Sequence, residues 1–337
     1  MKIVKKLSMR TDLAVEMQEV RKVSEQDGVF QEEISQNGIA VTRVKITDQK
    51  GADALGKPVG EYITVDFKDS FSDEQTHQNA VETTAGEISR LLFGEKDPEK
   101  KINPDGPGVL VIGLGNRRMM SDAVGPATID RILVTRHIQN NMPELYQKLA
   151  LHPVSAAAPG VLGQTGIEAS EVVQSLCREI RPEAVILIDA LASRRMERLC
   201  RTVQISNTGM CPGSGVGNKR AEISSRTLGV PVISIGVPMV VDAVTLTADT
   251  VELALRKIRE SLDGENSAVL NAFSAFEEYD GEEIIRGTLS PFDMNLVVTP
   301  KDIDRLTEKC AGLLALALNK TLQGGLSEEE ISALLGL

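Results

Sequence analysis

The sequence is poor in several residue types, and each shortage excludes a class of protein. With no Trp, 3 Tyr and 7 Phe, it has little material for a platform that stacks nucleotide bases. Acidic residues outnumber basic ones by 48 to 37, and the formal net charge of −11 argues against binding to nucleic-acid phosphates. No apolar run approaches the roughly 18 residues of a membrane-spanning helix. We therefore expect no direct contact with nucleic acid or with a membrane.

Reactive and metal-binding residues are also scarce. The 4 Cys form no CxxC pair, and we interpret them as reduced thiols of an intracellular protein. The 3 His leave few bases for a serine triad, and only His152 stays open as a pocket residue or metal ligand. P-loop, HExxH and GxSxG motifs are missing, and the glycine-rich stretches 113–115 and 213–217 do not complete a dinucleotide fingerprint. We therefore predict no cofactor.

A length of 337 residues predicts about two domains, or one large α/β domain with elaborations. Residues 1–38 are polar and only weakly periodic. Residues 39–47 and 60–67 alternate between apolar and polar side chains, which predicts two strands, and a capping-box pattern at Ser72 predicts that a helix follows. We assign residues 13–104 to an N-terminal α+β elaboration that is rich in strands.

From residue 108 onward, short and wholly apolar runs alternate with helical patterns. Such runs are typical of strands buried on both faces, so they predict a doubly wound, mostly parallel sheet flanked by helices. The predicted strands are 108–113, 184–188, 203–205, 231–235 and 296–300, and the helical patterns begin near Asp122 and cover 169–180, 248–260 and 303–317. The predicted α/β core spans 105–320, with an irregular acidic insertion at 260–290 and a helical tail at 321–337.

Two aspartates stand out by their position relative to these strands. Asp189 directly follows the apolar run AVILI, and Asp122 follows the turn GLGN at the start of a helix. Ligands of open α/β sheets bind at the carboxyl ends of the strands. A buried carboxylate needs a partner, which favours a functional role for Asp189, whereas Asp122 could instead cap its helix. In one cleft, the pair would share a proton and could act as base and acid on a water molecule.

Long blocks of the sequence also resemble a known family. The blocks are RTDLAVE at 10–16, VIGLGN at 111–116, DAVGP at 122–126, ILIDALASR at 186–194, PGSGVGNKR at 212–220 and LGVPVISIGVPMVVDAVT at 228–245. Together they resemble the germination proteases, endopeptidases that degrade small acid-soluble spore proteins when spores germinate. The resemblance implies a fold like that of hydrogenase-maturation endopeptidases, catalytic roles for Asp122 and Asp189, and no metal.

The resemblance also implies a zymogen that removes its own N-terminus. The family cuts substrates after the first acid of a motif like Thr-Glu-Phe-Ala-Ser-Glu, and Thr11 to Glu16 repeats this pattern. We therefore predict cleavage between Asp12 and Leu13, with residues 1–12 as the propeptide. The local alternative is a helix capped at Thr11. A pocket that prefers an acid needs a cation, and the candidates are Arg117, Arg118, Lys219 and Arg220.

The family resemblance further implies a homotetramer in the cytoplasm of the forespore or spore core. The segment 260–290 is shorter here than in the family pattern, which leaves its role open. Two alternatives remain at this point. One is a metal-dependent maturation endopeptidase that uses Asp122, Asp189 and His152, which a chelator would inactivate. The other is a non-catalytic protein that holds a peptide or nucleotide in the crevice, which would bind the peptide without turnover.

Overall fold

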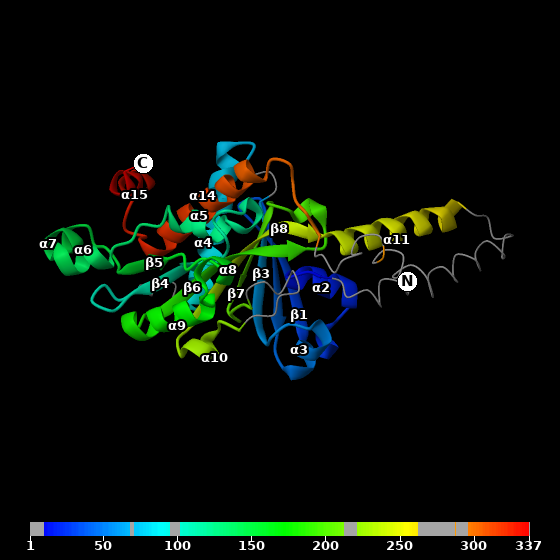
Figure 1. Cartoon of the computed structure of the whole chain (residues 1–337), viewed down its shortest axis with the longest axis horizontal. Helices are drawn as coiled ribbons and strands as arrows, with labels where there is room; N and C mark the ends of the chain where they lie inside the picture. Colours follow the sequence, from blue (N-terminus) through cyan, green and yellow to red (C-terminus); the bar gives the residue numbers. More distant parts are fainter. Residues whose placement is uncertain are drawn as a thin grey trace.

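The computed structural model describes residues 10–67, 71–94, 102–211, 221–261, 287 and 296–336. Its described strands form one nine-stranded sheet with helices on both faces (Figure 1). The strands are β1 Val29–Gln36, β2 Ile39–Ile46, β3 Gly60–Asp66, β4 Val109–Gly113, β5 Val154–Ala157, β6 Ala184–Ser193, β7 Thr202–Ser206, β8 Val232–Asp242 and β9 Val297–Val298.

The sheet is mixed, so the prediction of a mostly parallel sheet was wrong. The strand order is β1-β2-β3-β7-β8-β6-β4-β5, with β9 paired to β8. Neighbours among β5, β4, β6 and β8 are parallel, whereas β1, β2, β3, β7 and β9 join by antiparallel pairing. An apolar run shows that both faces of a strand are covered, but it does not determine whether the strand runs parallel or antiparallel to its neighbours. The run in β7 is buried because β7 lies in the middle of the sheet, antiparallel to both neighbours.

The N-terminal strands extend the same sheet rather than forming a separate one. The predicted strands 39–47 and 60–67 are confirmed as β2 and β3. Strand β1 was missed because it lies at the edge, where most of its side chains are exposed and show no alternation. A signal was available, since Asn37 and Gly38 link β1 to β2 with φ angles of 53° and 78°. Asn-Gly is the preferred pair for such a two-residue hairpin.

Helices cover both faces of the sheet. Helices α4, α5 and α14 pack on one side, and α9 and α10 lie on the other (Figure 1). The predicted helices after β3, at 169–180, at 248–260 and at 303–317 are confirmed, although Asp73 rather than Ser72 caps α4. The helices are α2 Ala14–Arg21, α3 Gln49–Leu55, α4 Glu74–Phe93, α5 Val124–Ile129, α6 Arg136–Asn141, α7 Pro143–Lys148, α8 Leu162–Thr165, α9 Ala169–Ile180, α10 Ser225–Leu228, α11 Ala243–Ser261, α14 Ile303–Leu322 and α15 Glu328–Leu335, with 3₁₀ turns η1 Glu25–Asp27, η2 Met120–Asp122 and η3 Met196–Arg198.

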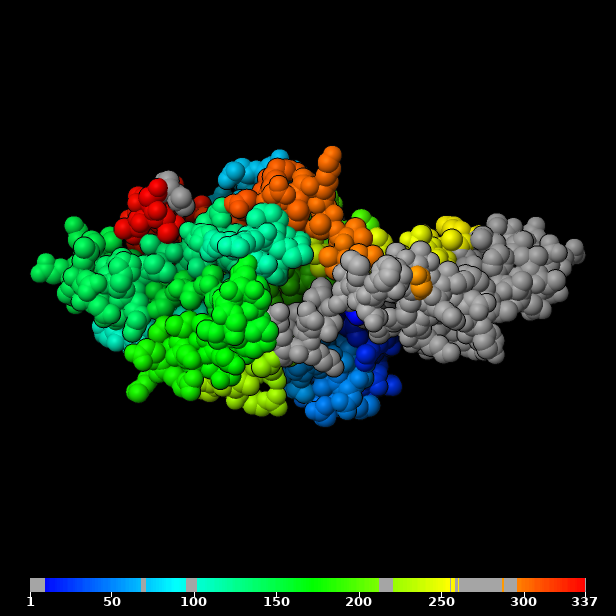
Figure 2. Space-filling view, in the orientation of Figure 1, coloured from blue at the N-terminus to red at the C-terminus, as the bar shows by residue number. Residues whose placement is uncertain are grey.

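The hydrophobic core has two main layers. The larger one lies between the sheet and helices α4 and α14, and the second lies between the sheet and α9. In the space-filling view, the orange and red C-terminal residues lie against the teal residues that follow β4 (Figure 2). A small third cluster under α2 and α3 anchors the N-terminal segment. Among the described helices, none combines the length and apolar character that a membrane crossing needs.

Strands β6 and β8 run well beyond the predicted apolar runs, to Ser193 and Asp242. The polar residue Asp189 and the residues Gly236 and Pro238 are of types that, in the local sequence, indicate the end of a strand. In the sheet, however, Asp189 lies opposite Gly236, and the pairing continues through a bulge after Leu191. The side chain of Leu191 fills the space above Gly236. The extension forms the floor of the cleft described next, whereas the insertion predicted at 260–290 lies almost entirely outside the described residues.

Candidate active site

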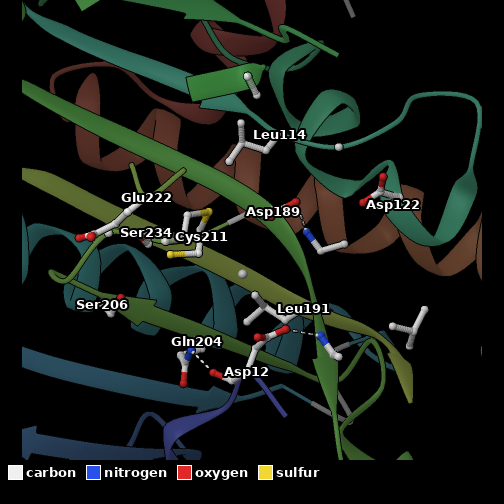
Figure 3. Close-up of a pocket in the computed structure, with 18 of the residues that line it drawn as sticks. Asp12, Leu114, Asp122, Asp189, Leu191, Gln204, Ser206, Cys211, Glu222 and Ser234 are labelled. Carbon is white, nitrogen blue, oxygen red and sulfur yellow. Dashed lines mark hydrogen bonds between the residues drawn. The ribbon is translucent and has the colours of Figure 1, made fainter. Parts of the chain in front are cut away.

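A cleft of about 480 Å³ opens where β4 ends, beside the middle of β6 and β8 (Figure 3). Several parts of the chain line it, among them the turn after β4, the second half of β6, the central strands β7 and β8, the turn between α3 and β3, and the N-terminal segment. The lining residues include Asp12, Lys57, Tyr62, Leu114, Gly115, Ser121, Asp122, Asp189, Ala190, Leu191, Ala192, Gln204, Ser206, Cys211, Glu222, Ser234 and Gly236. The two aspartates singled out from the sequence therefore share one cleft.

Asp122 is held by the turn that follows β4. The backbone N–H of Asn116 donates to Asp122 Oδ2 at 2.9 Å and to the Asp122 carbonyl at 3.0 Å. Gly115 makes this turn possible, because its φ is +110° and a Cβ there would lie 2.0 Å from the Asp122 carbonyl oxygen. Ala123, not Asp122, is the N-cap of α5. The capping alternative for Asp122 was therefore wrong, and its carboxylate faces the cleft and the turn instead.

Asp189 lies in β6, with only 7% of its surface exposed. Its Oδ1 accepts the N–H of Ala190 at 2.9 Å. The N–H of Leu114 donates to the Ile188 carbonyl at 2.8 Å, which ties the end of β4 to β6 and so brings the segments of both aspartates together. Figure 3 shows Asp122, Asp189 and Asp12 coming from three different segments around the cleft.

Asp12, the residue before the predicted cut, is held in this cleft by hydrogen bonds to both its backbone and its side chain. Its N–H donates to the Ala192 carbonyl at 2.8 Å, and the Ala192 N–H donates to Asp12 Oδ2 at 2.9 Å. Its carbonyl oxygen accepts from Lys57 Nζ at 2.9 Å and from Gln204 Nε2 at 3.0 Å. On the other side of the predicted cut, the Ala14 N–H donates to Gln204 Oε1 at 2.7 Å. The segment thus lies in the cleft as a peptide ligand would.

The second acid of the motif, Glu16, is bound as closely as the first. It is 1% exposed, and its carboxylate accepts from the backbone N–H of Arg194 at 2.6 Å and of Arg195 at 3.1 Å. Thr11 Oγ1 donates to it at 2.5 Å, and Arg198 Nε lies 3.4 Å away. Burial raises the pKa of Glu16, while these hydrogen bonds and the Arg198 charge act in the opposite direction.

The local alternative of a helix capped at Thr11 was wrong, because the helix begins later. Its first residue is Ala14, and Leu13 is its N-cap. The Thr11 hydroxyl instead connects two parts of the motif, since it accepts the Leu13 N–H at 3.1 Å and donates to Glu16. The side chain of Leu13 is completely buried. The bond predicted to be cut therefore joins an extended segment to a helix.

The structure describes two of the four predicted cations, Arg117 and Arg118. Arg117 forms a salt bridge with Asp130 at the surface, and Arg118 is exposed. Neither lines the cleft, while Lys219 and Arg220 lie outside the described residues. The groups that bind the two carboxylates were missed in the sequence: the backbone N–H groups at 192, 194 and 195, with Arg198 beside Glu16. Lys57 was also missed, and it donates to the backbone carbonyl of Asp12. The block ILIDALASR indicated the segment around these backbone N–H groups. No residue near Lys57 in the sequence distinguishes it from a solvated lysine.

His152, which stayed open as a pocket residue or metal ligand, does not line this cleft. Its N–H donates to Gln323 Oε1 at 2.9 Å, and its Nδ1 lies 3.1 Å from the Leu322 carbonyl. These contacts fix the end of α14 against the start of β5. Within the part of the chain that the structure describes, no three His, Cys, Asp or Glu side chains group as metal ligands would.

An α/β protein whose cleft contains two aspartates and an extended peptide segment has the arrangement expected of a peptidase. Comparison with known proteins agrees. The family model for germination proteases matches residues 8–275 and 262–334. A germination protease of Caldanaerobacter subterraneus subsp. tengcongensis is 45% identical, with 98% of each chain covered. Those of Clostridium perfringens and Priestia megaterium are 40% and 36% identical, covering 97% of this chain and 99% and 96% of theirs. The chain belongs to the germination protease family and is a protease.

Proposed function

We propose that this protein is a self-processing endopeptidase in which Asp122 and Asp189 together activate a water molecule. One carboxylate takes a proton from the water, and the other, protonated, gives its proton to the leaving amine of Leu13. The observation that carries the proposal is the position of Asp12. It lies in the same cleft as both aspartates and occupies it as a bound peptide. Residues 1–12 are then a propeptide.

The substrates we propose are small acid-soluble spore proteins, cut after an acidic residue that precedes an apolar one. The segment from Thr11 to Glu16 repeats the family's substrate pattern, and both of its acids are bound. Loss of residues 1–12 vacates the position of Asp12 beside the Ala192 N–H, whereas Glu16 stays in the processed chain. A substrate's first acid would therefore take the Ala192 position. This function places the protein in the forespore and spore core.

The test is intact mass against time for the purified chain at mildly acidic pH. We expect the wild type to lose residues 1–12 in one step, and Asp122→Asn and Asp189→Asn to keep their full mass. Asp130→Asn is the matched control, because Asp130 is exposed and paired with Arg117 outside the cleft. Processing of Asp189→Asn at the wild-type rate would refute the proposed roles. If the wild type keeps its mass, a chain starting at Leu13 is tested on a spore-protein substrate.

A chelator separates this mechanism from that of a metal-dependent maturation endopeptidase. We propose that the fold resembles that of those enzymes in one part, the four parallel strands β5, β4, β6 and β8. These strands position both aspartates. A chain incubated with EDTA and then dialysed should process at the rate of the untreated chain, because carboxyl groups alone supply the base and the acid. Loss of processing that returns when a divalent metal is added would favour the metal-dependent mechanism.

A further inference from the structure

We propose that Lys57 and Gln204 form the oxyanion site of this protease. Both donate to the carbonyl oxygen of Asp12, the oxygen that becomes negatively charged when water adds to the carbonyl carbon. The inference rests on the proposed function, because it takes the Asp12–Leu13 bond as the bond that is cut. It goes beyond that function by assigning two catalytic residues in addition to the aspartates.

Two separate elements supply these donors. Lys57 lies in the turn between α3 and β3, and Gln204 lies in the central strand β7. Their nitrogens are 2.9 Å and 3.0 Å from the Asp12 oxygen, within the ordinary range for N–H···O hydrogen bonds. A carbonyl oxygen has two lone pairs, and here side-chain donors occupy both. Paired donors on the carbonyl before the cut are the arrangement by which acyl-transfer enzymes stabilise a tetrahedral intermediate.

The amide of Gln204 holds both sides of the same peptide bond. Its Nε2 donates to the Asp12 carbonyl, while its Oε1 accepts the Ala14 N–H at 2.7 Å. Only 8% of Gln204 is exposed, so its side chain has little freedom. The Asp12 N–H bond to the Ala192 carbonyl fixes the chain on the preceding side. The bond is therefore positioned before the reaction starts, which lowers the entropy lost in reaching the transition state.

Lys57 brings a positive charge to this position. Its side chain is half-buried, and burial lowers the pKa of Lys57 below its ordinary value, although the nearby charges of Asp12, Cys211 and Glu16 act in the opposite direction. These acidic neighbours oppose the shift, and Lys57 Nζ donates to the Asp12 carbonyl oxygen. A cation next to a developing oxyanion in a partly dehydrated cleft interacts more strongly than it would in water.

The reaction balances with these groups in place. The water oxygen bonds to the Asp12 carbonyl carbon, one water proton passes to the carboxylate, and the C=O electron pair moves onto the oxygen. Lys57 and Gln204 donate to that oxyanion and keep their own protons. The C=O bond then re-forms, the C–N bond breaks, and the protonated carboxyl group gives its proton to the Leu13 nitrogen. The products are a carboxyl group on Asp12 and an amine on Leu13, and no other reactant is needed.

The test measures the processing rate of the full-length chain by intact mass. Lys57→Met removes the cation, and Gln204→Glu removes the Nε2 donor but keeps an oxygen to accept the Ala14 N–H. Each should process roughly 100-fold more slowly than the wild type or worse, the loss typical of one oxyanion donor. Lys57→Arg keeps a cation and should recover part of the rate. Lys50→Met is the control, because Lys50 is an exposed lysine of the neighbouring helix α3.

Thermal unfolding first establishes that each variant is folded, and Asp189→Asn is measured in parallel. If Lys57→Met and Gln204→Glu are folded and process within a few-fold of the wild type, while Asp189→Asn is inactive, the oxyanion site is wrong and the proposed function stands. If a folded Lys57→Arg variant processes as slowly as Lys57→Met, the positive charge of Lys57 has no role in the reaction. Wild-type processing by Asp189→Asn would instead overturn the proposed function itself.

Discussion

At the scale of single residues, Glu16 shows how the N-terminal segment is held in place. A buried carboxylate is costly unless hydrogen bonds and charges compensate for lost hydration. Here the backbone N–H groups of Arg194 and Arg195, the Thr11 hydroxyl and the Arg198 charge offset part of that cost, although burial still raises the pKa of Glu16. The same contacts fix the loop after β6, the strand that carries Asp189. Glu16 therefore couples the N-terminal segment to the strand that forms the floor of the cleft.

Glu16→Gln should change how stability depends on pH. Because the pKa of Glu16 is raised in the folded protein, the folded state holds this proton to higher pH than the unfolded chain, whose value is near 4.5. The contribution of Glu16 to the free energy of unfolding is therefore greatest below pH 4.5 and falls as the pH rises through the folded pKa. Glutamine has no proton to lose, so the wild type should lose stability relative to Glu16→Gln over this range.

Urea unfolding of both chains, from below pH 4.5 to neutrality, measures this difference. Both chains also carry Asp189→Asn, because this substitution is expected to prevent processing during the experiment. A difference in unfolding free energy that stays constant across the range, or that grows in favour of the wild type, would contradict the raised pKa of Glu16.

At the scale of elements, helix α5 sits unusually close to the ends of β4 and β6. A Cβ at Gly125 would lie 2.3 Å from the Leu114 carbonyl oxygen and 2.6 Å from that of Ile188. These distances are shorter than a carbon and an oxygen can tolerate, so only glycine allows the helix to start there. The start of α5 directly follows Asp122, and its position therefore sets where that carboxylate lies.

Gly125→Ala should destabilise the protein by about 1–3 kcal/mol or more, because α5 must move away from two backbone carbonyls. The displacement should also slow processing, since Asp122 moves with the helix. Gly163→Ala is the matched control: it lies in α8, and a Cβ there would meet nothing within 4 Å. Thermal unfolding and intact mass measure both effects. Equal stability of the two variants would show that α5 adjusts without cost.

At the scale of the whole molecule, we expect a homotetramer, which follows from the family resemblance. Light scattering on a sizing column should give about four times the 36.4 kDa mass of the chain. Asp189→Asn should give the same mass, because Asp189 lies inside the cleft rather than on an outer surface. A monomer mass at every concentration tested would contradict the expectation.

Much of the fold was predictable from local patterns. The apolar runs at β4, β6 and β8 and the helical periodicity of α9 and α14 identified those elements, because each pattern reflects burial of a face. Asp122 and Asp189 were found because each follows an apolar run; Asp122 lies after the end of β4, whereas Asp189 lies inside β6, which continues to Ser193. Strand direction was not predictable, since β7 pairs antiparallel with strands that are distant in sequence.

The sequence by itself determined the family, the strands and helices of the core, the two aspartates that follow apolar runs, and the acid pattern from Thr11 to Glu16. Only the tertiary structure decided what surrounds the Asp12 carbonyl. Lys57 is 45 residues and Gln204 is 192 residues away from Asp12 along the chain, and neither has a local pattern that marks it. Local patterns report which side of an element is buried, whereas contacts between distant residues depend on how the strands pair and in which register.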